Sequence, residues 1–519
     1  MINIPRHFTK KLTCGAIIKG TMILTFAGII SKVLGFVYRI LLTRQIGSEG
    51  LGLCQVAMPV LGIVFSLCCV GFQAAISRFT AKNTKDGTLW LVSSLCFCMP
   101  VAVILSTITF LKADLFATRI LLQPDAAGCV RCLSLSFPFI VLHDCCCGYF
   151  YGYKKTAVPA VSQLLEQSSR IITLIGISIL FQKNGITMTP EAALTANLLG
   201  EITAAVYSLS RVRHHKNKGN NNLIPAIKSL PVTLKFALPL SLNSLLLHLF
   251  QSAEAVLIPA QLMVSGCSSS ESLKLYGILS GMAMPLIMLP SVLTNSLAVL
   301  LMPSVAEESK NTGTTIQNTI KVCLNLGILS IFLYYFFLSH VGAYIFGEEL
   351  LCQFTRLLSF LCPFIYMSTT ITSILNGAGK TTYTCILNTL GIAIRLSSLV
   401  FLVPRYGINA YLYSLLISKI SVCLLGYIKI SHLFHIKMDA GSYIIKPLLC
   451  SSLATGISLF STYLFKTMSA SIGLNVYDSP ICETIVRMAA ACLAVVIYFI
   501  QWYIFSRSMG AKTGKGASL

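Results

Sequence analysis

The residues of this sequence that could do chemistry are charged side chains inside long apolar stretches. Lys32 and Arg39 come first, and they lie seven residues apart. In a helix this spacing places both cations on one face, two turns apart, which suits two points on a diphosphate-bearing lipid. Alternatively, Lys32 snorkels or pairs with an acid, and Arg39 and Arg44 are interfacial anchors.

Four further ionisable residues interrupt later apolar stretches. Glu166 and Arg170 lie four residues apart, so they can pair directly on one helix, and a structural ion pair is the favoured interpretation. Glu201 and Glu254 are isolated acids. A lone carboxylate in hydrocarbon can carry a proton or bind a sodium ion, and a counterion role for Lys32 or Arg39 is an equal alternative.

His143 and Asp144 precede Cys145, Cys146 and Cys147, which superficially offers metal ligands or a nucleophile with a base. Adjacent helical positions point about 100° apart, so these side chains cannot converge without another segment. We therefore expect no metal site, no cofactor and no catalytic residue. No outer loop gathers acids or histidines as a membrane transferase would need, so the chain is predicted not to be an enzyme.

The elements that must position these residues are membrane helices. Of the 519 residues, 55% are hydrophobic and only 11% are charged, and the mean hydropathy is +0.79. A soluble core of ordinary shape cannot hide so much apolar surface. Apolar blocks such as 89–111 and 322–338 are unbroken, which excludes the alternating strands of a barrel. The predicted fold class is an all-α integral membrane protein.

The apolar blocks predict about fourteen transmembrane helices, separated by charged or Gly-, Pro- and Asn-rich segments. Because this number is even, both termini are expected on one side of the membrane. The predicted spans are 17–42, 50–77, 88–111, 129–151, 157–181, 190–210, 233–263, 274–302, 318–346, 351–376, 382–403, 408–430, 442–465 and 482–506.

The formal charge of +22 does not indicate nucleic-acid binding, because the basic residues punctuate apolar spans rather than gather on one solvated face. Alternate loops hold roughly twice as many basic residues as the others, as the positive-inside rule describes. This pattern places both termini in the cytoplasm, with the stretch before residue 13 as an uncleaved tail. The cysteines inside spans are expected to be reduced packing residues.

The two halves of the chain show an internal repeat at an offset of about 225 residues. The offset places Pro138 on Pro363 and Arg170 on Arg395, whereas Gly391 stands where Glu166 would. Arg395 therefore needs another partner, and a substrate phosphate can be one. Each half has six spans, so the halves should be related by an axis along the membrane normal and enclose a cleft.

These observations predict four regions. Residues 1–210 form an N-terminal six-helix lobe, 211–232 a cytoplasmic linker, 233–431 a C-terminal six-helix lobe, and 432–519 two extra helices and a cytoplasmic tail. Met58-Pro59 and Met284-Pro285 also correspond in the repeat, and prolines inside spans permit either bends for alternating access or simple packing kinks.

Three stretches carry a family resemblance. Residues 19–59 (KGTMILTFAGIISKVLGFVYRILLTRQIGSEGLGLCQVAMP), 71–82 (GFQAAISRFTAK) and 376–381 (NGAGKT) resemble stage V sporulation protein B and related polysaccharide-biosynthesis membrane proteins. These belong to the multidrug/oligosaccharidyl-lipid/polysaccharide exporter (MOP) superfamily. The resemblance implies two six-helix bundles that alternate between inward-open and outward-open states, and a role in peptidoglycan synthesis of the spore cortex by export of an undecaprenyl-diphosphate-linked sugar.

The lipid II flippase branch of this superfamily carries two basic residues in its first span, in a motif Ser-Arg-Val-Leu-Gly-Phe-x-Arg-Asp. Here the matching stretch begins at Ser31, with Lys32 in place of the first Arg, Tyr38 in place of the second and Arg39 in place of the acid. The expected substrate-binding residues are Lys32, Arg39, Arg170 and Arg395, and the candidates for ion coupling are Glu254, Glu201 and Glu166.

Two other functions compete with lipid flipping. A cation-coupled multidrug exporter would use Glu254 and Glu201 against cationic, apolar substrates, but the expected cleft has a surplus of cations. A non-transporting scaffold for envelope enzymes would need sizeable docking loops, and the sequence has only the stretch 211–222. The expected partners are a lipid-linked oligosaccharide or lipid II-like substrate and membrane lipids; the oligomeric state stays open.

Overall fold

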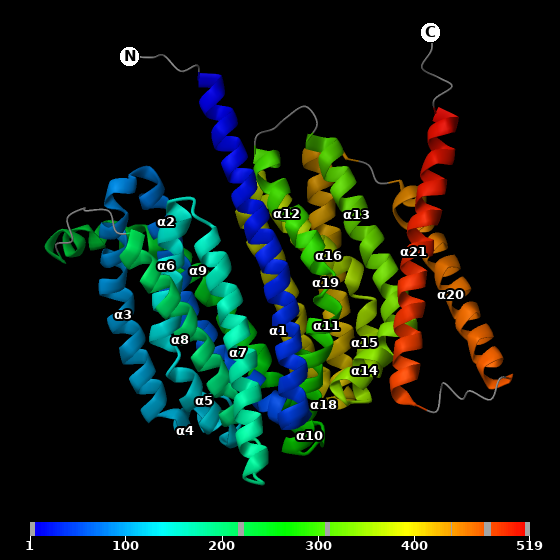
Figure 1. The fold of residues 1–519 in the computed structure, drawn as a ribbon, viewed down its shortest axis with the longest axis horizontal. Helices are drawn as coiled ribbons and strands as arrows, with labels where there is room; N and C mark the ends of the chain where they lie inside the picture. Colours follow the sequence, from blue (N-terminus) through cyan, green and yellow to red (C-terminus); the bar gives the residue numbers. More distant parts are fainter. Residues whose placement is uncertain (1–5, 216–222, 307–311, 437–438, 472–478, 514–519) are drawn as a thin grey trace. The chain divides into compact units, whose positions relative to one another are not determined.

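The computed structural model describes residues 6–215, 223–306, 312–436, 439–471 and 479–513, and every regular element within these ranges is helical. The chain divides into two compact units, Met1–Gly277 (unit 1) and Ile278–Leu519 (unit 2). Figure 1 shows both units as bundles of long helices. This confirms the all-α prediction.

Unit 1 is built from long helices joined by short turns. Helices α7 and α8 pack along each other, and α1 packs against α7. The bounds are α1 Arg6–Phe65, α2 Gly71–Lys82, α3 Gly87–Leu111, α4 Ala113–Leu115, α5 Ala127–Ser134, α6 Phe137–Gly152, α7 Ala157–Lys183, α8 Pro190–His215, α9 Leu223–Val264 and α10 Ser269–Tyr276.

Unit 2 has a second group of long helices, among which α12 and α13 pack on α16, α17 packs on α19 and α20 packs on α21. The bounds are α11 Met284–Met288, α12 Ser291–Ala306, α13 Thr312–Leu333, α14 Ser339–Phe346, α15 Leu350–Ser359, α16 Cys362–Gly377, α17 Thr381–Phe401, α18 Val403–Tyr406, α19 Ile408–Phe434, α20 Lys446–Ser471 and α21 Pro480–Thr513.

Ten helical segments of the described chain are long and apolar enough to cross a membrane, or up to thirteen if each of three bent helix pairs forms one span. One of the ten, Thr25–Lys82, has 58 residues and contains Gly47 with a non-helical backbone (φ 71°, ψ 178°). At about 1.5 Å per residue it is long enough to cross a hydrocarbon core of about 30 Å twice. If the three bent pairs are also counted as spans, two crossings there would bring the thirteen to the fourteen that the apolar blocks predict.

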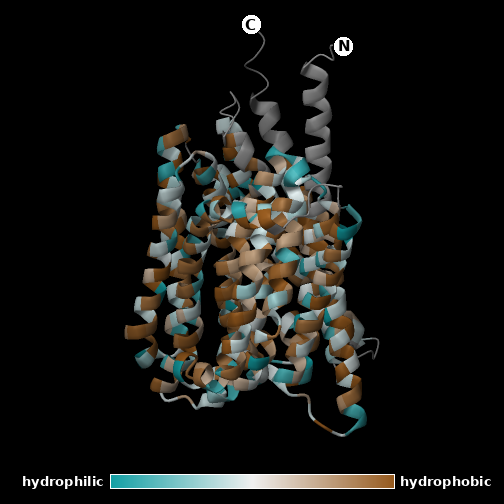
Figure 2. Ribbon diagram, turned by 90° about the vertical axis from the view of Figure 1, so that its left-hand side faces the viewer, coloured by the Kyte–Doolittle hydropathy of each residue, from teal (hydrophilic) through white to brown (hydrophobic). Residues whose placement is uncertain are grey.

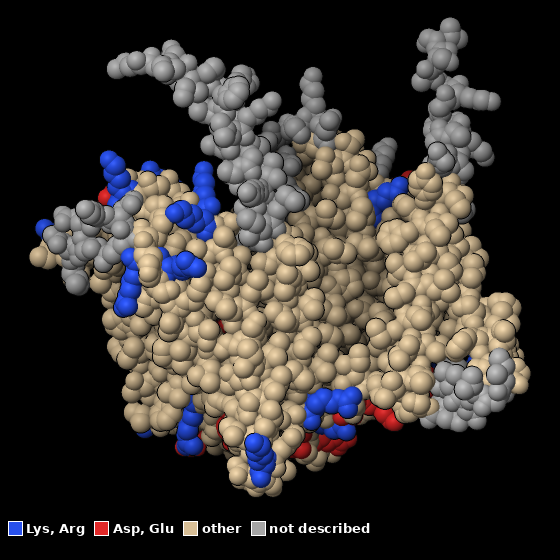
Figure 3. Space-filling view, viewed as in Figure 1, with Lys and Arg blue, Asp and Glu red and all other residues tan. Residues whose placement is uncertain are grey.

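The surfaces of the helices suit a lipid environment. Figure 2 shows hydrophobic residues along most of the length of the helices that face the viewer. On the face drawn in Figure 3, Lys, Arg, Asp and Glu lie mainly near helix ends, and the surface between is almost uncharged. The protein is thus a multi-pass membrane protein.

The sequence repeat has a counterpart in the helix bounds. Helix α16 begins and ends 225 residues after α6, and α13 begins 225 residues after α3. The predicted linker, 211–232, is helical where the structure describes it, because α8 extends to His215 and α9 begins at Leu223; residues 216–222 lie outside the described chain.

The cysteines of the apolar stretches serve the core. Cys145, Cys146 and Cys147 are free thiols and are buried, and Cys145 and Cys146 belong to a hydrophobic cluster with Phe72 and Tyr149. A small, weakly polar side chain packs there without needing a strong hydrogen bond. This agrees with the packing role predicted for them.

Candidate functional site

The candidate site is a cavity of about 300 Å³ inside unit 1, between α1, α2, α6, α7 and α8. Its polar wall is formed by acids, amides, one histidine and one tyrosine, whereas Leu61, Phe65, Ile140 and Pro159 supply apolar surface. The polar lining residues are Gln73, His143, Asp144, Tyr151, Gln163, Glu166 and Glu201. Charged groups in a membrane-spanning segment are expensive, so a cavity that gathers three acids is a candidate functional site.

Arg170 of α7 is a cation that contacts two of the acids of this cavity. Its Nη2 lies 2.6 Å from Glu166 Oε1, one turn earlier on α7, and 2.8 Å from Glu201 Oε1 on α8. The first contact is the pair that the spacing of the sequence predicts. The second joins two helices, and it could not be read from local spacing. All three side chains are largely buried, so their charges act through a weakly screening medium.

Gly200 makes room for Arg170 where α7 and α8 meet. A Cβ at position 200 would lie 2.6 Å from Arg170 Cγ and 3.1 Å from Arg170 Nε. Any larger residue there would push the guanidinium away from Glu201. Gly200, next to Glu201, therefore permits the geometry of the Arg170–Glu201 ion pair. The sequence alone did not identify this glycine.

His143 of α6 lies between α7 and α8. Its Nε2 is 3.0 Å from Ser162 Oγ, which itself donates to Pro159 O at 2.8 Å. When the single hydroxyl proton of Ser162 is given to Pro159 O, His143 Nε2–H is the donor in the His143–Ser162 bond, and neutral histidine then has a lone pair on Nδ1. That nitrogen lies 3.9 Å from Glu201 Oε2. A lone pair facing a carboxylate repels it, so one additional proton would stabilise this pair.

Asp144, next to His143, adds a third acid. Gln73 Nε2 donates to Asp144 Oδ1 at 3.3 Å, but Asp144 Oδ2 is buried and has no hydrogen-bond partner in the described part of the chain. If all three carboxyls are ionised and His143 is neutral, the Arg170 guanidinium balances one of the three negative charges, and two remain around the cavity. A proton or a bound cation can compensate them.

A metal ion is the other species that such a group could hold. One donor atom from each of His143, Glu166 and Glu201 lies within 4.8 Å of the others. However, the Arg170 guanidinium already contacts both glutamates and would repel a divalent cation, so a proton fits the site better. His143 and Asp144 alone are a weak signal in the sequence, because their partner residues come from α7 and α8, which are remote in sequence.

The two cations predicted on the first helix have different surroundings. Lys32 is exposed, whereas Arg39 is half-buried. Arg39 and the buried Tyr38 lie within electrostatic range of Arg170. The backbone of α1 runs close to α7 there, since a Cβ at Gly35 would lie 3.4 Å from Gln167 Oε1. The structure thus brings Arg39 toward the Arg170 group and leaves Lys32 on the surface.

The remaining predicted residues lie outside the cavity. Arg395 of α17 donates from Nη1 to Ser418 Oγ of α19 at 3.3 Å, and Ser418 donates to Gly391 O at 2.8 Å. Glu254 is buried on α9 and does not line the cavity.

Solved structures share the fold of this chain. A structure of lipid II flippase MurJ in an inward closed conformation aligns with a TM-score of 0.71 at 17% identity, covering 94% of this chain and 99% of that one. An inward-facing multidrug resistance MATE family transporter of the MOP superfamily aligns with a TM-score of 0.62 at 15% identity, covering 78% and 96%. The chain therefore has the MurJ- and MATE-like fold of the MOP superfamily.

Sequence comparison identifies the family of this protein. The polysaccharide biosynthesis protein family matches residues 17–309, more than half of the chain, so the protein belongs to the polysaccharide biosynthesis protein family. Stage V sporulation protein B of Bacillus subtilis (strain 168) is 24% identical over 470 residues, which cover 86% of this chain and 90% of that protein. These findings confirm the family resemblance.

Proposed function

We propose that this protein flips an undecaprenyl-diphosphate-linked sugar precursor, similar to lipid II, across the cell membrane by alternating access. The observation that carries the proposal is a fold similarity that runs through 94% of the chain and includes a lipid II flippase. Membership of the polysaccharide biosynthesis protein family supports a sugar-bearing cargo. Similarity to stage V sporulation protein B supports a role in making spore cortex peptidoglycan.

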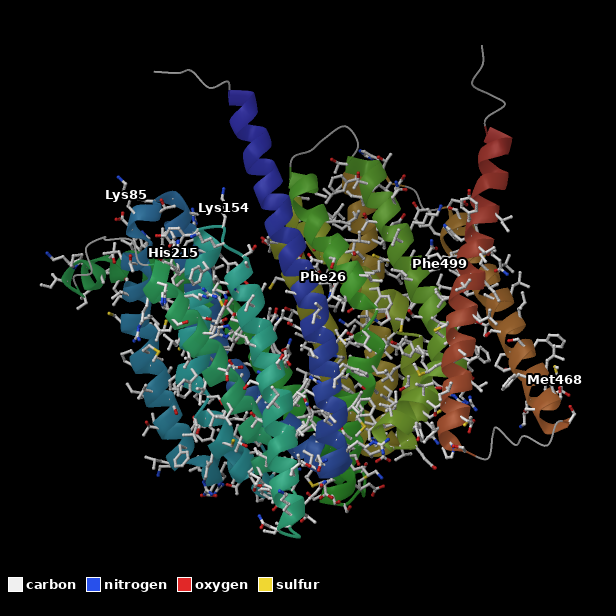
Figure 4. All side chains as sticks on the ribbon, viewed as in Figure 1. Phe26, Lys85, Lys154, His215, Met468 and Phe499 are labelled. Carbon is white, nitrogen blue, oxygen red and sulfur yellow. The ribbon has the colours of Figure 1, made fainter. Side chains whose placement is uncertain are left out.

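Lys32 is the first candidate to bind the diphosphate. It is exposed on α1, where Phe26, Val33 and Val37 are also exposed (Figure 4 labels Phe26). An ammonium group among exposed apolar side chains suits a lipid diphosphate, because the cation binds phosphate oxygens and the apolar surface accepts the polyprenyl chain. Arg39 extends the same helix face by two turns.

Arg170 and Arg395 take different parts in this proposal. Glu166 and Glu201 balance the charge of Arg170, so this residue reaches a phosphate only after one of the acids is neutralised. Arg395 occupies the place of Arg170 in the sequence repeat and contacts the hydroxyl of Ser418. Because of this repeat relation, Arg395 is the second candidate for the substrate, and Arg170 links the substrate to the acids.

The acids of the cavity supply the coupling step. A proton on Glu201 or on His143 Nδ1 removes the repulsion across their 3.9 Å contact. It also weakens the ion pair between Glu201 and Arg170. We assign proton coupling to Glu201 and Glu166, with Glu254 on α9 as the competing position. Proton uptake would then favour one conformational state of the transporter through the differential affinity of the two states for the proton.

The orientation follows from the charges of unit 1. Lys82, Lys85, Lys154 and Arg211 lie in the turns and helix ends at one end of unit 1, and Figure 4 shows Lys85, Lys154 and His215 there. The opposite end mixes cations with acids such as Asp114. By the positive-inside rule, we propose that this basic end of unit 1 faces the cytoplasm.

A cation-coupled multidrug exporter is the second candidate. The excess negative charge of the cavity favours it, since a cationic apolar drug would find both an acid and apolar wall residues there. The two functions differ in which residues bind cargo. Flipping depends on Lys32 and Arg39, whereas drug export depends on Asp144, Glu166 and Glu201.

The experiment is a flipping assay in proteoliposomes that contain the full-length chain and a fluorescent undecaprenyl-diphosphate-linked sugar. The double variant Lys32→Gln/Arg39→Gln should abolish flipping while its reconstituted amount stays normal. Lys85→Gln, which removes one cation at the end of unit 1, is the matched control and should flip at the wild-type rate. Wild-type flipping by the double variant would reject the binding site; export of a cationic drug with no flipping by the wild type would reject the function.

A further inference from the structure

A second group of charged side chains lies in unit 2, where α14 packs against both α15 and α21. Arg356 of α15 contacts the imidazole of His340 on α14, with its Nη2 3.1 Å from His340 Nε2 and 3.4 Å from His340 Nδ1. Arg487 and Glu483 of α21 lie within electrostatic range of the same imidazole. Figure 1 shows α14, α15 and the beginning of α21 at the lower end of unit 2.

His340 is a neutral hydrogen-bond acceptor in this group. A guanidinium has only donors, so His340 must offer a lone pair to Arg356 Nη2. The shorter contact assigns that lone pair to Nε2. The proton is then on Nδ1, which lies 3.3 Å from Ser339 Oγ and 3.4 Å from Cys352 Sγ. His340 therefore adds no charge to the group.

Glu483 balances the charge of Arg487 and leaves that of Arg356 unbalanced. Glu483 Oε1 accepts hydrogen bonds from Arg487 Nε at 3.0 Å and from Arg487 Nη2 at 2.7 Å. Within the described part of the chain, the side chain of Arg356 contacts His340 and the ring of Tyr335, whose centre lies 5.9 Å from Arg356 Cζ, and no acid. Two guanidinium groups, one carboxylate and a neutral imidazole leave one net positive charge.

The Nε atom of Arg356 is a second, independent observation. It is buried and has no hydrogen-bond partner in the ranges that the structure describes. A buried N–H without an acceptor costs free energy, and the cost is larger when the group is charged. In a guanidinium, Nε–H and a neighbouring Nη–H form the fork that binds two oxygens of one phosphate or carboxylate. The unpaired donor and the net charge both indicate an anionic acceptor.

An exposed aromatic patch, formed by Tyr335, Phe336 and Phe360, lies beside Arg356. Each of the three side chains is more than a third exposed, and the ring of Tyr335 lies 5.0 Å from that of Phe336 and 6.2 Å from that of Phe360. Tyr335 belongs to the π-helical turn Tyr334–Leu338, a conformation that is frequent at functional sites. Aromatic residues are enriched at the level of lipid head groups. A guanidinium beside exposed rings therefore suits an anionic head group with apolar chains.

We propose that Arg356 binds the phosphodiester of an anionic bilayer phospholipid, whose glycerol and upper acyl chains lie on the aromatic patch. The single negative charge of the phosphodiester equals the net positive charge of the group, and Arg356 Nε gains an acceptor. A free inorganic anion would balance the charge but would leave the exposed rings uncovered. The site is independent of the proposed function, because it shares no residue with the cavity of unit 1 or with the residues proposed to bind the cargo.

The test places a fluorescent reporter in the aromatic patch. The tryptophans of the chain are Trp90 and Trp502, so the full-length protein with Trp90→Phe, Trp502→Phe and Phe360→Trp has one indole, in the patch. Phosphatidylglycerol and phosphatidylcholine, each brominated on the upper acyl chains, are titrated into this protein in micelles, and quenching is measured. Phosphatidylglycerol should quench at a lower mole fraction than phosphatidylcholine. Arg356→Gln in this background should weaken the phosphatidylglycerol effect about 5-fold, since one basic residue near an anionic lipid is worth about 1 kcal/mol.

Arg405→Gln is the matched control, because it removes one exposed guanidinium from α18, at the same end of unit 2, and should leave the preference unchanged. Arg356→Lys keeps the charge and should retain most of the preference, which gives a second reading if Arg356→Gln fails to fold. Equal quenching by the two lipids, or an unchanged preference in Arg356→Gln, would overturn the proposal. Displacement by inorganic phosphate at constant ionic strength would show a free-ion site, and displacement by an undecaprenyl-diphosphate-linked sugar would show a cargo site; either result overturns the assignment to a bilayer lipid.

Discussion

Arg170 and Arg395 occupy equivalent places in the sequence repeat, yet their surroundings differ. Arg170 contacts Glu166 and Glu201, and these acids open onto a polar cavity. Arg395 contacts the hydroxyl of Ser418. The residues 225 positions after the two glutamates are both glycines, Gly391 and Gly426.

The glycines of the second half let helices approach rather than hold charge. A Cβ at Gly426 would lie 2.5 Å from Ile371 Cγ2 on α16, and one at Gly391 would lie 3.0 Å from Val422 Cγ2 on α19. The repeat has kept the basic residue and exchanged its acids for close packing. We infer that the two halves have separate tasks, with an arginine held by two acids in unit 1 and an arginine that contacts a hydroxyl in unit 2.

The largest expected effect concerns the coupling of flipping to a proton gradient. In proteoliposomes with an imposed pH gradient, Glu201→Gln should abolish the dependence of flipping on that gradient, because the amide cannot take up the proton. Glu254→Gln should keep the dependence. Glu483→Gln is a matched control in unit 2, where Glu483 Oε1 lies 2.7 Å from Arg487 Nη2. Loss of the dependence in Glu254→Gln but not in Glu201→Gln would move the coupling site to α9.

The second effect is on stability. Arg170→Leu leaves two buried carboxylates without their cation and should lower the free energy of unfolding by roughly 3 to 5 kcal/mol. Arg395→Leu removes a hydrogen bond from a charged group to a hydroxyl and should cost about 1.5 kcal/mol. Denaturant titration of both variants in mixed micelles measures the difference. Equal losses would mean that the two arginines have the same structural role.

The sequence predicts the helices of the fold in more detail than it predicts the contacts of the candidate site. Long apolar blocks specify membrane helices directly, and the charges between them indicate orientation, so spans such as 157–181 and 190–210 match α7 and α8 closely. Spacing also predicts the pair Glu166–Arg170. Glu201 and His143 approach each other only through the packing of α6, α7 and α8, and no local pattern encodes that contact. The repeat identifies Arg395, but its contact with Ser418 again depends on helix packing.

Gly200 gives a smaller effect on the same geometry. Gly200→Ala should lower the free energy of unfolding by about 1 to 3 kcal/mol, because the new Cβ would overlap the Arg170 side chain. Gly176→Ala on α7 is the control, since a Cβ there meets nothing within 4 Å. Thermal unfolding of the two variants in detergent separates the clash from the general effect of alanine. A Gly200→Ala protein as stable as Gly176→Ala would show that Arg170 can adopt another rotamer at no cost.

Ser418→Ala should have the smallest effect. It removes the hydroxyl between Arg395 Nη1 and Gly391 O and should cost about 1 kcal/mol. If Ser418 only steadies Arg395, binding of a lipid diphosphate should weaken in parallel, whereas Ser418→Thr, which keeps a hydroxyl, should bind as the wild type does. Unchanged binding by Ser418→Ala would separate Arg395 from the substrate.

Recognition of the lipid-linked cargo is tested by binding of a defined undecaprenyl-diphosphate-linked sugar to the purified full-length protein, measured by native mass spectrometry in competition with a cationic apolar drug. We expect that the lipid-linked sugar binds, that Lys32→Gln/Arg39→Gln weakens this binding, and that the drug does not displace it. Binding of the drug alone, with no binding of the lipid-linked sugar, would reject lipid flipping.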